Sequence, residues 1–325
     1  MPYTNAQATP RADIYALVQQ ANTDFNKLFI ADLVLPVKSE DARRGIYMKA
    51  NLANAELLNA DALPREGGAG YNRVNRRFDT DTYDCQEYGL ESVVDDAYEA
   101  EVERFMNLEA TEAMLLERSL KISYEARVAA AIFNTTTFGT GATPVASYTA
   151  AAVAAGTIDV TADVDAAKTV LLKRGILANA VVMSQDIYNR IRRTSLLQNQ
   201  VYGVVPRVAG QRALPNEQDI ANALGVENLF VGKAPYNTAN KAATYSGSFI
   251  WNSTNIWVGQ VQGGEYTAGG VGRTISWTKD SVGLFTPETY RSDERRSNVI
   301  RVRQNVAEKI IDSTAGEIVT VNVSA

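Results

Sequence analysis

The chain has 325 residues, 46% hydrophobic and 21% charged, which is the composition of an ordered globular protein with one large or two ordinary domains. It has no histidine and one cysteine, which excludes histidine-based catalysis, the usual zinc sites and an internal disulfide. The net charge of -5 gives the chain no bulk attraction to nucleic acid. The sequence contains no run of about 18 apolar residues, so it predicts no membrane span.

The N-terminal region predicts an amphipathic helix over residues 12–29. Its apolar face consists of Ile14, Leu17, Val18, Ala21, Phe25, Leu28 and Phe29. A short apolar run, Leu33–Leu35, follows and is ended by Pro36. The N-terminus lacks the basic and apolar regions of a signal peptide, so we expect assembly in a cytoplasm.

Two strand-like stretches, Gly45–Lys49 and Phe78–Gln86, flank the polar segment LPREGGAGYNRVNRR. That segment has too few large apolar residues to form a core of its own. The pattern predicts a long projection resembling a β-hairpin, with a flexible tip, that lies on something outside itself.

The segment from about Asp96 to Phe133 contains no glycine or proline and predicts one long helix. Such a helix would be about 57 Å long, at ~1.5 Å per residue. Asp95 or Asp96 is suited to cap its N-terminus. Its apolar spacing has no sustained heptad, which favours a helix packed on a sheet over a coiled coil. Its carboxylates, such as Glu109 and Glu112, are interpreted as a solvated or interface-facing stripe rather than a catalytic pair.

An α/β region follows a connection rich in Thr, Ala and Gly (134–162), and the chain then becomes rich in strands. The predicted elements in order are a helix at Asp165–Arg174 closed by Gly175, a buried strand at Asn179–Ser184, a helix at Gln185–Asn199, a helix from Pro215 to Gly225, a buried strand NLFVG, a hairpin FIWNSTNIWVG turning at Asn252–Asn255, and the strands RTISWTKD, NVIRVRQ and EIVTVNV.

Short motifs do not point to catalysis. GVENLFVGK lacks the spacing and the Ser or Thr of a phosphate-binding loop, and Ser276–Lys279 matches S-x-x-K without its partner motifs. Cys85 is interpreted as a small strand residue. We therefore assign no catalytic residue, no cofactor-binding residue and no metal ligand, and we predict that the protein is not an enzyme.

The order of arm, long hairpin, very long helix, α/β module and returning strands resembles the major capsid protein of tailed bacteriophages, the Hong Kong 97-like fold. The phrases that carry the resemblance are FIADLVLPV, YEARVAAAIFN, NAVVMSQDIYNRI, IANALGVENLFVGKAPYN and NVIRVRQNVAEKIID. The resemblance covers nearly the whole chain and implies an α+β fold. Its parts would be an N-terminal arm (1–40), an extended loop (41–92), a peripheral domain with a spine helix (93–160), an axial domain (161–270) and returning strands of the peripheral domain (271–325).

The resemblance also implies a function. Copies would form pentamers and hexamers of an icosahedral or prolate head shell around phage double-stranded DNA, located in the virion and assembled in the host cytoplasm. The implied partners are other copies, a scaffolding protein, a portal protein at one vertex, a possible decoration protein, and DNA without sequence-specific contacts; no membrane is involved. The chain starts almost at the arm, so we expect a separate scaffolding protein or a segment outside this sequence. Lys49 lies in the extended loop, but nothing indicates an activated lysine, and we predict no crosslink.

Charge is segregated along the chain. Residues 65–77 hold four arginines and Glu66, a net charge of +3, whereas residues 95–112 hold seven acidic residues and Arg104, a net charge of -6. We hypothesise that the basic loop lies on the acidic spine of a neighbouring subunit; the bland alternative is two solvated faces. The candidate inter-subunit contacts are Arg65, Arg73, Arg76, Arg77, Glu99, Glu101 and Glu103, with Ile14, Leu17, Phe25 and Phe29 of the arm expected to dock on a neighbour.

Two other functions fit parts of the sequence. An encapsulin-like nanocompartment would keep the fold and enclose a cargo enzyme instead of DNA. A carboxylate-dependent hydrolase with an accessory α/β domain would be a monomer or small oligomer with a deep cleft. The contents of purified particles distinguish the first, and the oligomeric state distinguishes the second.

Overall fold

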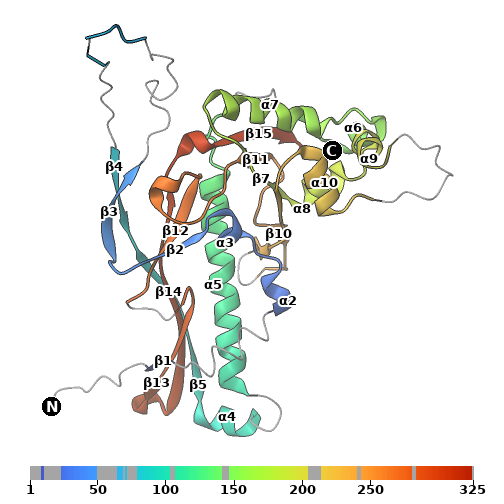
Figure 1. The fold of residues 1–325 in the computed structure, drawn as a ribbon. Helices are drawn as coiled ribbons and strands as arrows, with labels where there is room; N and C mark the ends of the chain where they lie inside the picture. Colours follow the sequence, from blue (N-terminus) through green and yellow to red (C-terminus); the bar gives the residue numbers. More distant parts are fainter. Residues whose placement is uncertain are drawn as a thin grey trace.

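One helix, α5 (Leu108–Ile132), runs along the molecule, and two sheets are arranged around it (Figure 1). At ~1.5 Å per residue, its 25 residues span about 37 Å. The computed structural model describes residues 9–10, 23–49, 64–68, 70–71, 79–102, 107–140, 146–203, 214–239, 243–279 and 283–323.

The first sheet has six strands and packs one face on α5. Its members are β1 (Thr9–Pro10), β2 (Val37–Glu40), β5 (Gln86–Asp95), β12 (Gly272–Trp277), β13 (Thr286–Ser292) and β14 (Ser297–Ile310). The order is β1-β13-β14-β12-β2, with β5 on the other edge of β14. Ile300 of β14 packs with Leu108 and Ala113 of α5, so this sheet and the helix share a core.

The second sheet has five strands in the order β6-β15-β11-β7-β8. They are β6 (Ala146–Ser147), β7 (Ala180–Ser184), β8 (Asn228–Gly232), β11 (Asn255–Gly259) and β15 (Gly316–Asn322). Its helices are α6 (Ala150–Ala155), α7 (Val160–Lys173), α8 (Gln185–Ile191), α9 (Ser195–Tyr202) and α10 (Glu217–Leu224).

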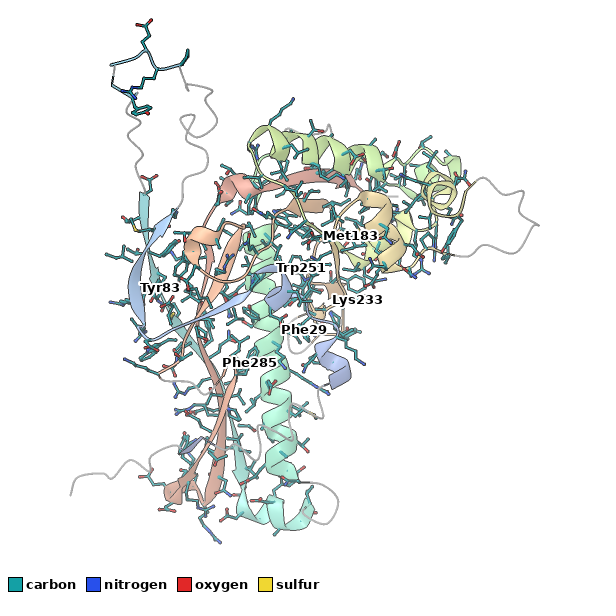
Figure 2. The ribbon with its side chains drawn as sticks, viewed as in Figure 1. Phe29, Tyr83, Met183, Lys233, Trp251 and Phe285 are labelled. Carbon is teal, nitrogen blue, oxygen red and sulfur yellow. The ribbon has the colours of Figure 1, made fainter. Side chains whose placement is uncertain are left out.

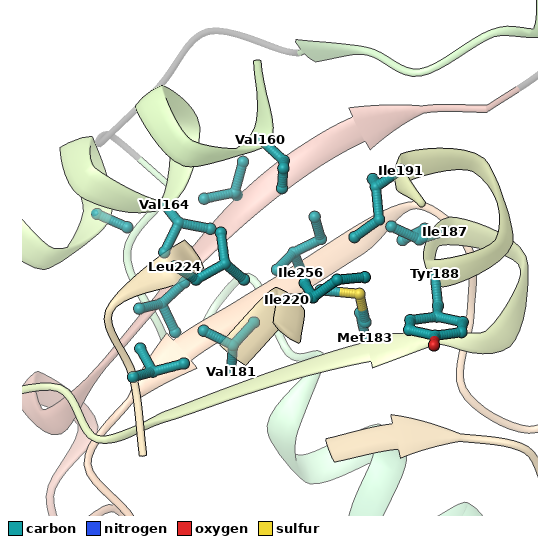
Figure 3. Packing of buried hydrophobic residues seen from close by; sticks show 14 of the residues in the cluster. Val160, Val164, Val181, Met183, Ile187, Tyr188, Ile191, Ile220, Leu224 and Ile256 are labelled. Carbon is teal, nitrogen blue, oxygen red and sulfur yellow. The ribbon is translucent and has the colours of Figure 1, made fainter. Parts of the chain in front are cut away.

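Side-chain alternation divides this second sheet between two cores. Val181, Met183 and Ile256 pack with residues of α7, α8 and α10 on one face (Figure 3). Val182 and Trp257 point to the other face and belong to the core around α5. The end of α5 therefore connects the two sheets.

The remaining elements of the described residues lie around this framework. They are α2 (Thr23–Asn26), α3 (Ala31–Val34), the paired strands β3 (Arg44–Lys49) and β4 (Asp79–Asp84), α4 (Asp96–Val102), the paired strands β9 (Pro235–Asn237) and β10 (Gly247–Phe249), and three short 3-10 helices, η2 (Tyr266–Ala268), η3 (Asp293–Arg295) and η4 (Ser313–Ala315).

Several predicted elements are confirmed. The stretches around Gly45–Lys49 and Phe78–Gln86 do pair, as antiparallel β3 and β4. Strand β7 is buried throughout, and α10 begins at the capping residue Asn216 and ends at Gly225. Gly175 follows α7 with a φ of 79°, a conformation that glycine adopts at little cost. The predicted tip of the hairpin falls largely outside the described residues.

The prediction of one helix from Asp96 to Phe133 is wrong in its first third. Asn107 has extended dihedrals and its side chain accepts the N–H of Ala110 at 3.0 Å, so a new helix begins at Leu108. The preceding α4 lies across the end of α5 (Figure 1). Asp95, one of the two predicted caps, accepts the N–H of Ala97 and serves α4 instead.

Two further predictions are corrected. The hairpin expected at 249–259 does not form, because β10 pairs with β9 while β11 pairs with β7 and β15. The helix expected at Gln185–Asn199 is divided into α8 and α9, and the Gln198 amide donates to the Arg192 carbonyl at 3.0 Å across the corner.

The arm and the domain boundaries are only partly comparable with the predictions. Of the helix expected at 12–29, the structure describes residues 23–29, where α2 ends at Asn26. The domain boundaries stay predictions, although β15, placed with the peripheral strands, pairs with β11 in the second sheet.

The break before α5 gives a first prediction. Replacing Asn107 with Ala should lower the free energy of unfolding by about 1 kcal/mol, because the first N–H groups of α5 lose their side-chain acceptor. Urea unfolding measures the change. Asn199→Ala, at an exposed position inside α9, is the control and should be neutral or slightly stabilising. Equal losses in the two variants would contradict a capping role.

Candidate subunit-assembly surfaces

The hairpin of β3 and β4 is anchored at its base and projects from the body (Figure 1). Tyr47 and Tyr83 are buried with Ile275 of β12, and the Tyr47 ring stacks on Tyr266 with centroids 4.7 Å apart. The opposite face carries Ile46 and Met48, whose side chains are 74% and 53% exposed. One face of the hairpin therefore holds it to the body, and the other presents apolar side chains to solvent.

The predicted basic residues of this projection are described only at Arg65. Its guanidinium lies over the Tyr71 ring, 4.7 Å from the centroid, and donates to the Tyr71 hydroxyl at 3.3 Å. The described residues 64–68 and 70–71, which include this pair, lie at the far end of the projection (Figure 1). Arg73, Arg76 and Arg77 lie outside the described residues.

Helix α4, which carries the two described members of the predicted acidic set, lies at the opposite end of the molecule (Figure 1). Glu99 and Glu101 are on α4, where Glu101 is exposed and Glu99 is half-buried. Next to them, the Asp96 carboxylate pairs with Arg291, which lowers the Asp96 pKa. Glu103 lies outside the described residues. The structure therefore does not bring Arg65 to Glu99 or Glu101 within one chain.

The arm contacts its own spine helix through residues on one face of α5, which we call the arm seat: Arg118, Lys121 and Glu125. The Arg118 guanidinium lies 4.8 Å from the centre of the Phe25 ring, and Lys121 donates to the Asn26 side chain at 2.7 Å. Lys121 also pairs with Glu117, which is buried.

Both predicted aromatic residues of the arm are at this seat. Phe25 and Phe29 meet edge to face, with centroids 4.9 Å apart. Phe29 also lines a cavity of about 240 Å³ together with Lys121 and Phe285, and Figure 2 shows Phe29 and Phe285 beside α5. Ile14 and Leu17 lie outside the described residues, so their docking on a neighbour stays a prediction.

Glu125 is the most enclosed residue of the seat, with a side chain that is 0% exposed. Its two carboxylate oxygens accept the backbone N–H of Ile30 at 3.0 Å, that of Ala31 at 2.9 Å and the indole N–H of Trp251 at 2.6 Å. Burial raises the pKa of this carboxyl to about 7, and the three donors oppose that shift. The sequence contained no signal for this site, because a glutamate on a long helix is usually solvated.

The described part of the chain has neither a candidate metal site nor an exposed cysteine. No group of three or more His, Cys, Asp or Glu side chains is placed there to hold a metal ion. The Cys85 thiol is buried, and burial raises its pKa to about 11, which disfavours the reactive thiolate. No helix in the described ranges is long and apolar enough to cross a membrane.

Comparison with known proteins gives structural neighbours only. No family model and no curated protein matches the sequence. The chain is similar to a phage-related protein from Bordetella bronchiseptica RB50, with 16% identity and a TM-score of 0.67 over 96% of this chain and 97% of that one. It is similar to the capsid structure of the cyanophage P-SCSP1u, with 11% identity and a TM-score of 0.54 over 100% and 92% of the two chains. It is also similar to the mature capsid of bacteriophage PhiM1, with 10% identity and a TM-score of 0.52 over 88% and 85%.

The buried carboxylate gives a second prediction, about pH. Because the pKa of Glu125 is higher in the folded protein than in the unfolded chain, its contribution to stability is full below about pH 4.5 and is lost as the pH rises through about 7. The stability of the wild type relative to Glu125→Gln should therefore fall by about 3 kcal/mol across that window, at ~1.4 kcal/mol per pKa unit.

Urea unfolding of both proteins between pH 4.5 and 8 measures this difference directly. The difference between the two stabilities cancels the contributions of the other carboxylates, because the two proteins share them. Parallel stability curves would show that Glu125 does not titrate in this range.

Over 88–100% of its length, the chain has the fold of the two solved phage capsids, which agrees with the fold that its sequence resembles.

Proposed function

We propose that this protein is the major capsid protein of a tailed phage, and that its copies form pentamers and hexamers of a head shell around double-stranded DNA. The observation that carries the proposal is the full-length match to phage capsid structures. The projecting hairpin with exposed Ile46 and Met48 supports it, since apolar side chains on a projection are covered when another copy lies against them.

The proposal includes the other participants that such a shell needs. A scaffolding protein would guide assembly in the host cytoplasm, a portal protein would occupy one vertex, and a decoration protein would be an optional addition. The net charge of -5 favours DNA that is enclosed without being held at each phosphate. We propose no catalytic role and no cofactor.

Electron microscopy of the purified protein tests the proposal. We expect hollow particles, or rings of five and six subunits, from the protein alone or with a candidate scaffolding protein. Particles that contain DNA and a portal support a phage head, whereas particles that contain one folded cargo protein support the nanocompartment. A protein that stays monomeric under all these conditions would contradict a shell and favour the hydrolase.

The charge segregation gives a further prediction. Replacing Arg73, Arg76 and Arg77 with Glu should leave the protein folded and soluble but prevent shell formation, because the loop would then repel the acidic segment of a neighbour. Each exposed pair contributes only ~0–1 kcal/mol, but the pairs repeat at every subunit contact. Changing Glu99, Glu101 and Glu103 to Lys in the same chain should partly restore shells.

The control reverses three exposed charges outside the loop, at Lys173, Arg193 and Lys279. It makes the same change in net charge and should assemble more normally than the loop variant. Normal shells from the loop variant at low salt would reject the contact, and equal failure of both variants would assign the effect to net charge.

A further inference from the structure

We propose that Glu125 is a positioning residue that fixes where the N-terminal arm and the projecting hairpin leave the subunit, and thereby sets the curvature with which copies close into a shell. The first half of this inference concerns the single chain, and the second half rests on the proposed function.

Glu125 holds the arm by its backbone rather than by a side chain. Helix α3 starts at Ala31, and its N-cap residue, Ile30, makes no capping hydrogen bond with its side chain. The N–H groups of Ile30 and Ala31 instead donate to the two oxygens of the Glu125 carboxylate. Glu125 thus does for α3 what a capping side chain normally does, from a residue 95 positions away. Two donors on two oxygens fix the direction of the arm as well as its position.

That direction is transmitted to the hairpin over a short length of chain. Helix α3 leads through Leu35 and Pro36 into β2, which pairs parallel with β12 and is followed by β3. The Thr274 N–H of β12 donates to the Pro36 carbonyl at 3.1 Å, and the Thr274 hydroxyl lies 2.8 Å from the Tyr124 hydroxyl on α5. The segment between α3 and the hairpin is therefore held by hydrogen bonds to the first sheet, and a change in the direction of α3 would be passed on to the hairpin.

The third donor ties the same carboxylate to the second sheet. Trp251, labelled in Figure 2, donates to Glu125 and precedes the central strand β11. Its ring meets Phe133 edge to face, with centroids 5.3 Å apart. Trp251 also lies so close to Gly232 of β8 that a Cβ atom there would collide with its ring. A displacement of Glu125 would therefore change how the arm sits relative to both sheets.

A carboxylate is well suited to this position. All three of its partners are N–H donors, and the ionised carboxylate, the form that predominates above about pH 7, is an acceptor only. In a glutamine, one oxygen becomes an NH₂ group that faces donors and cannot accept from them. Glu125→Gln therefore removes an acceptor with little change in size, and Trp251→Phe removes one donor while retaining an aromatic ring.

The experiment compares these variants with matched controls of the same chemistry. Glu317→Gln changes another buried glutamate, which lies on β15, away from the arm. The Glu317 carboxylate pairs with Arg174 at 2.9 Å. Trp257→Phe changes another fully buried tryptophan, whose indole nitrogen has no hydrogen-bond partner among the described residues. The readouts are hydrogen exchange at the amides of Ile30 and Ala31 in dissociated subunits, and the diameters of assembled particles.

We expect Glu125→Gln to accelerate exchange at Ile30 and Ala31 at least tenfold and to broaden or shift the particle diameters. Trp251→Phe should give the same changes at smaller amplitude. It is the test variant to use if Glu125→Gln does not fold. The two controls should lower the melting temperature without moving either readout. Unchanged arm exchange and diameters in both test variants would overturn the inference, as would equal changes in the controls.

The outcome separates this inference from the proposed function. If the wild type forms no shells, the proposed function fails, and the exchange data still decide whether Glu125 holds the arm. If the wild type forms shells and the variants form shells of unchanged diameter, the positioning role in assembly fails while the proposed function stands.

Discussion

Three segments that are distant in the sequence meet at one buried carboxylate, that of Glu125. The arm contributes two backbone N–H groups, the segment before β11 contributes the Trp251 indole, and α5 contributes the carboxylate. Removing a carboxylate from water is costly, and the cost is offset only if donors replace the lost water. Here the donors come from the arm and from the segment before β11, both of which also pack in the core around α5, so the folding of the arm depends on α5 being in place.

The same helix explains why the molecule is extended rather than round. Ile300 of the first sheet and Val182 of the second sheet both face cores that include α5, but at different positions along its length. The two sheets therefore lie along the helix instead of stacking on each other. Such a shape buries less surface per residue than a sphere. Exposed apolar side chains such as Ile46, Met48 and Leu33 follow from that shape.

The sequence correctly predicted the elements that are marked by neighbouring residues. The predictions were wrong where contacts between distant parts of the chain determine the structure. Helix α10 was predictable because Asn216 and Gly225 mark its ends, and β7 because five consecutive residues are buried. The 249–259 hairpin looked plausible locally, but β11 finds its partners in β7 and β15, which are far away in the chain. The segment Asn252–Asn255 lacks the Asn-Gly or Asp-Gly pair of a favoured hairpin turn, so the local hairpin was not stable enough to replace the pairing of β11 with β7 and β15.

The sequence did not predict the break in the long helix or the Glu125 site, and the reasons differ. Asn107 has ordinary helix propensity, and only its side-chain bond to Ala110 shows that a helix begins there. Glu125 could not be distinguished from the other glutamates of α5, because two of its partners are backbone groups about 95 residues away and the third is the indole of Trp251, 126 residues away. Backbone donors leave no trace in the identities of the residues that carry them.

The positions of the charged segments finally restrict how copies can meet. Arg65 lies on the projection, whereas Glu99 and Glu101 lie on α4 at the other end of the molecule (Figure 1). If these segments attract each other, the contact must join two copies. It would also join different surfaces on the two copies, which is a heterologous contact. Repeating a heterologous contact produces a ring when its rotation closes and an open filament when it does not. Whatever fixes the direction in which the projection leaves the subunit therefore also decides between a closed shell and an open polymer, and in this chain that direction is set next to Glu125.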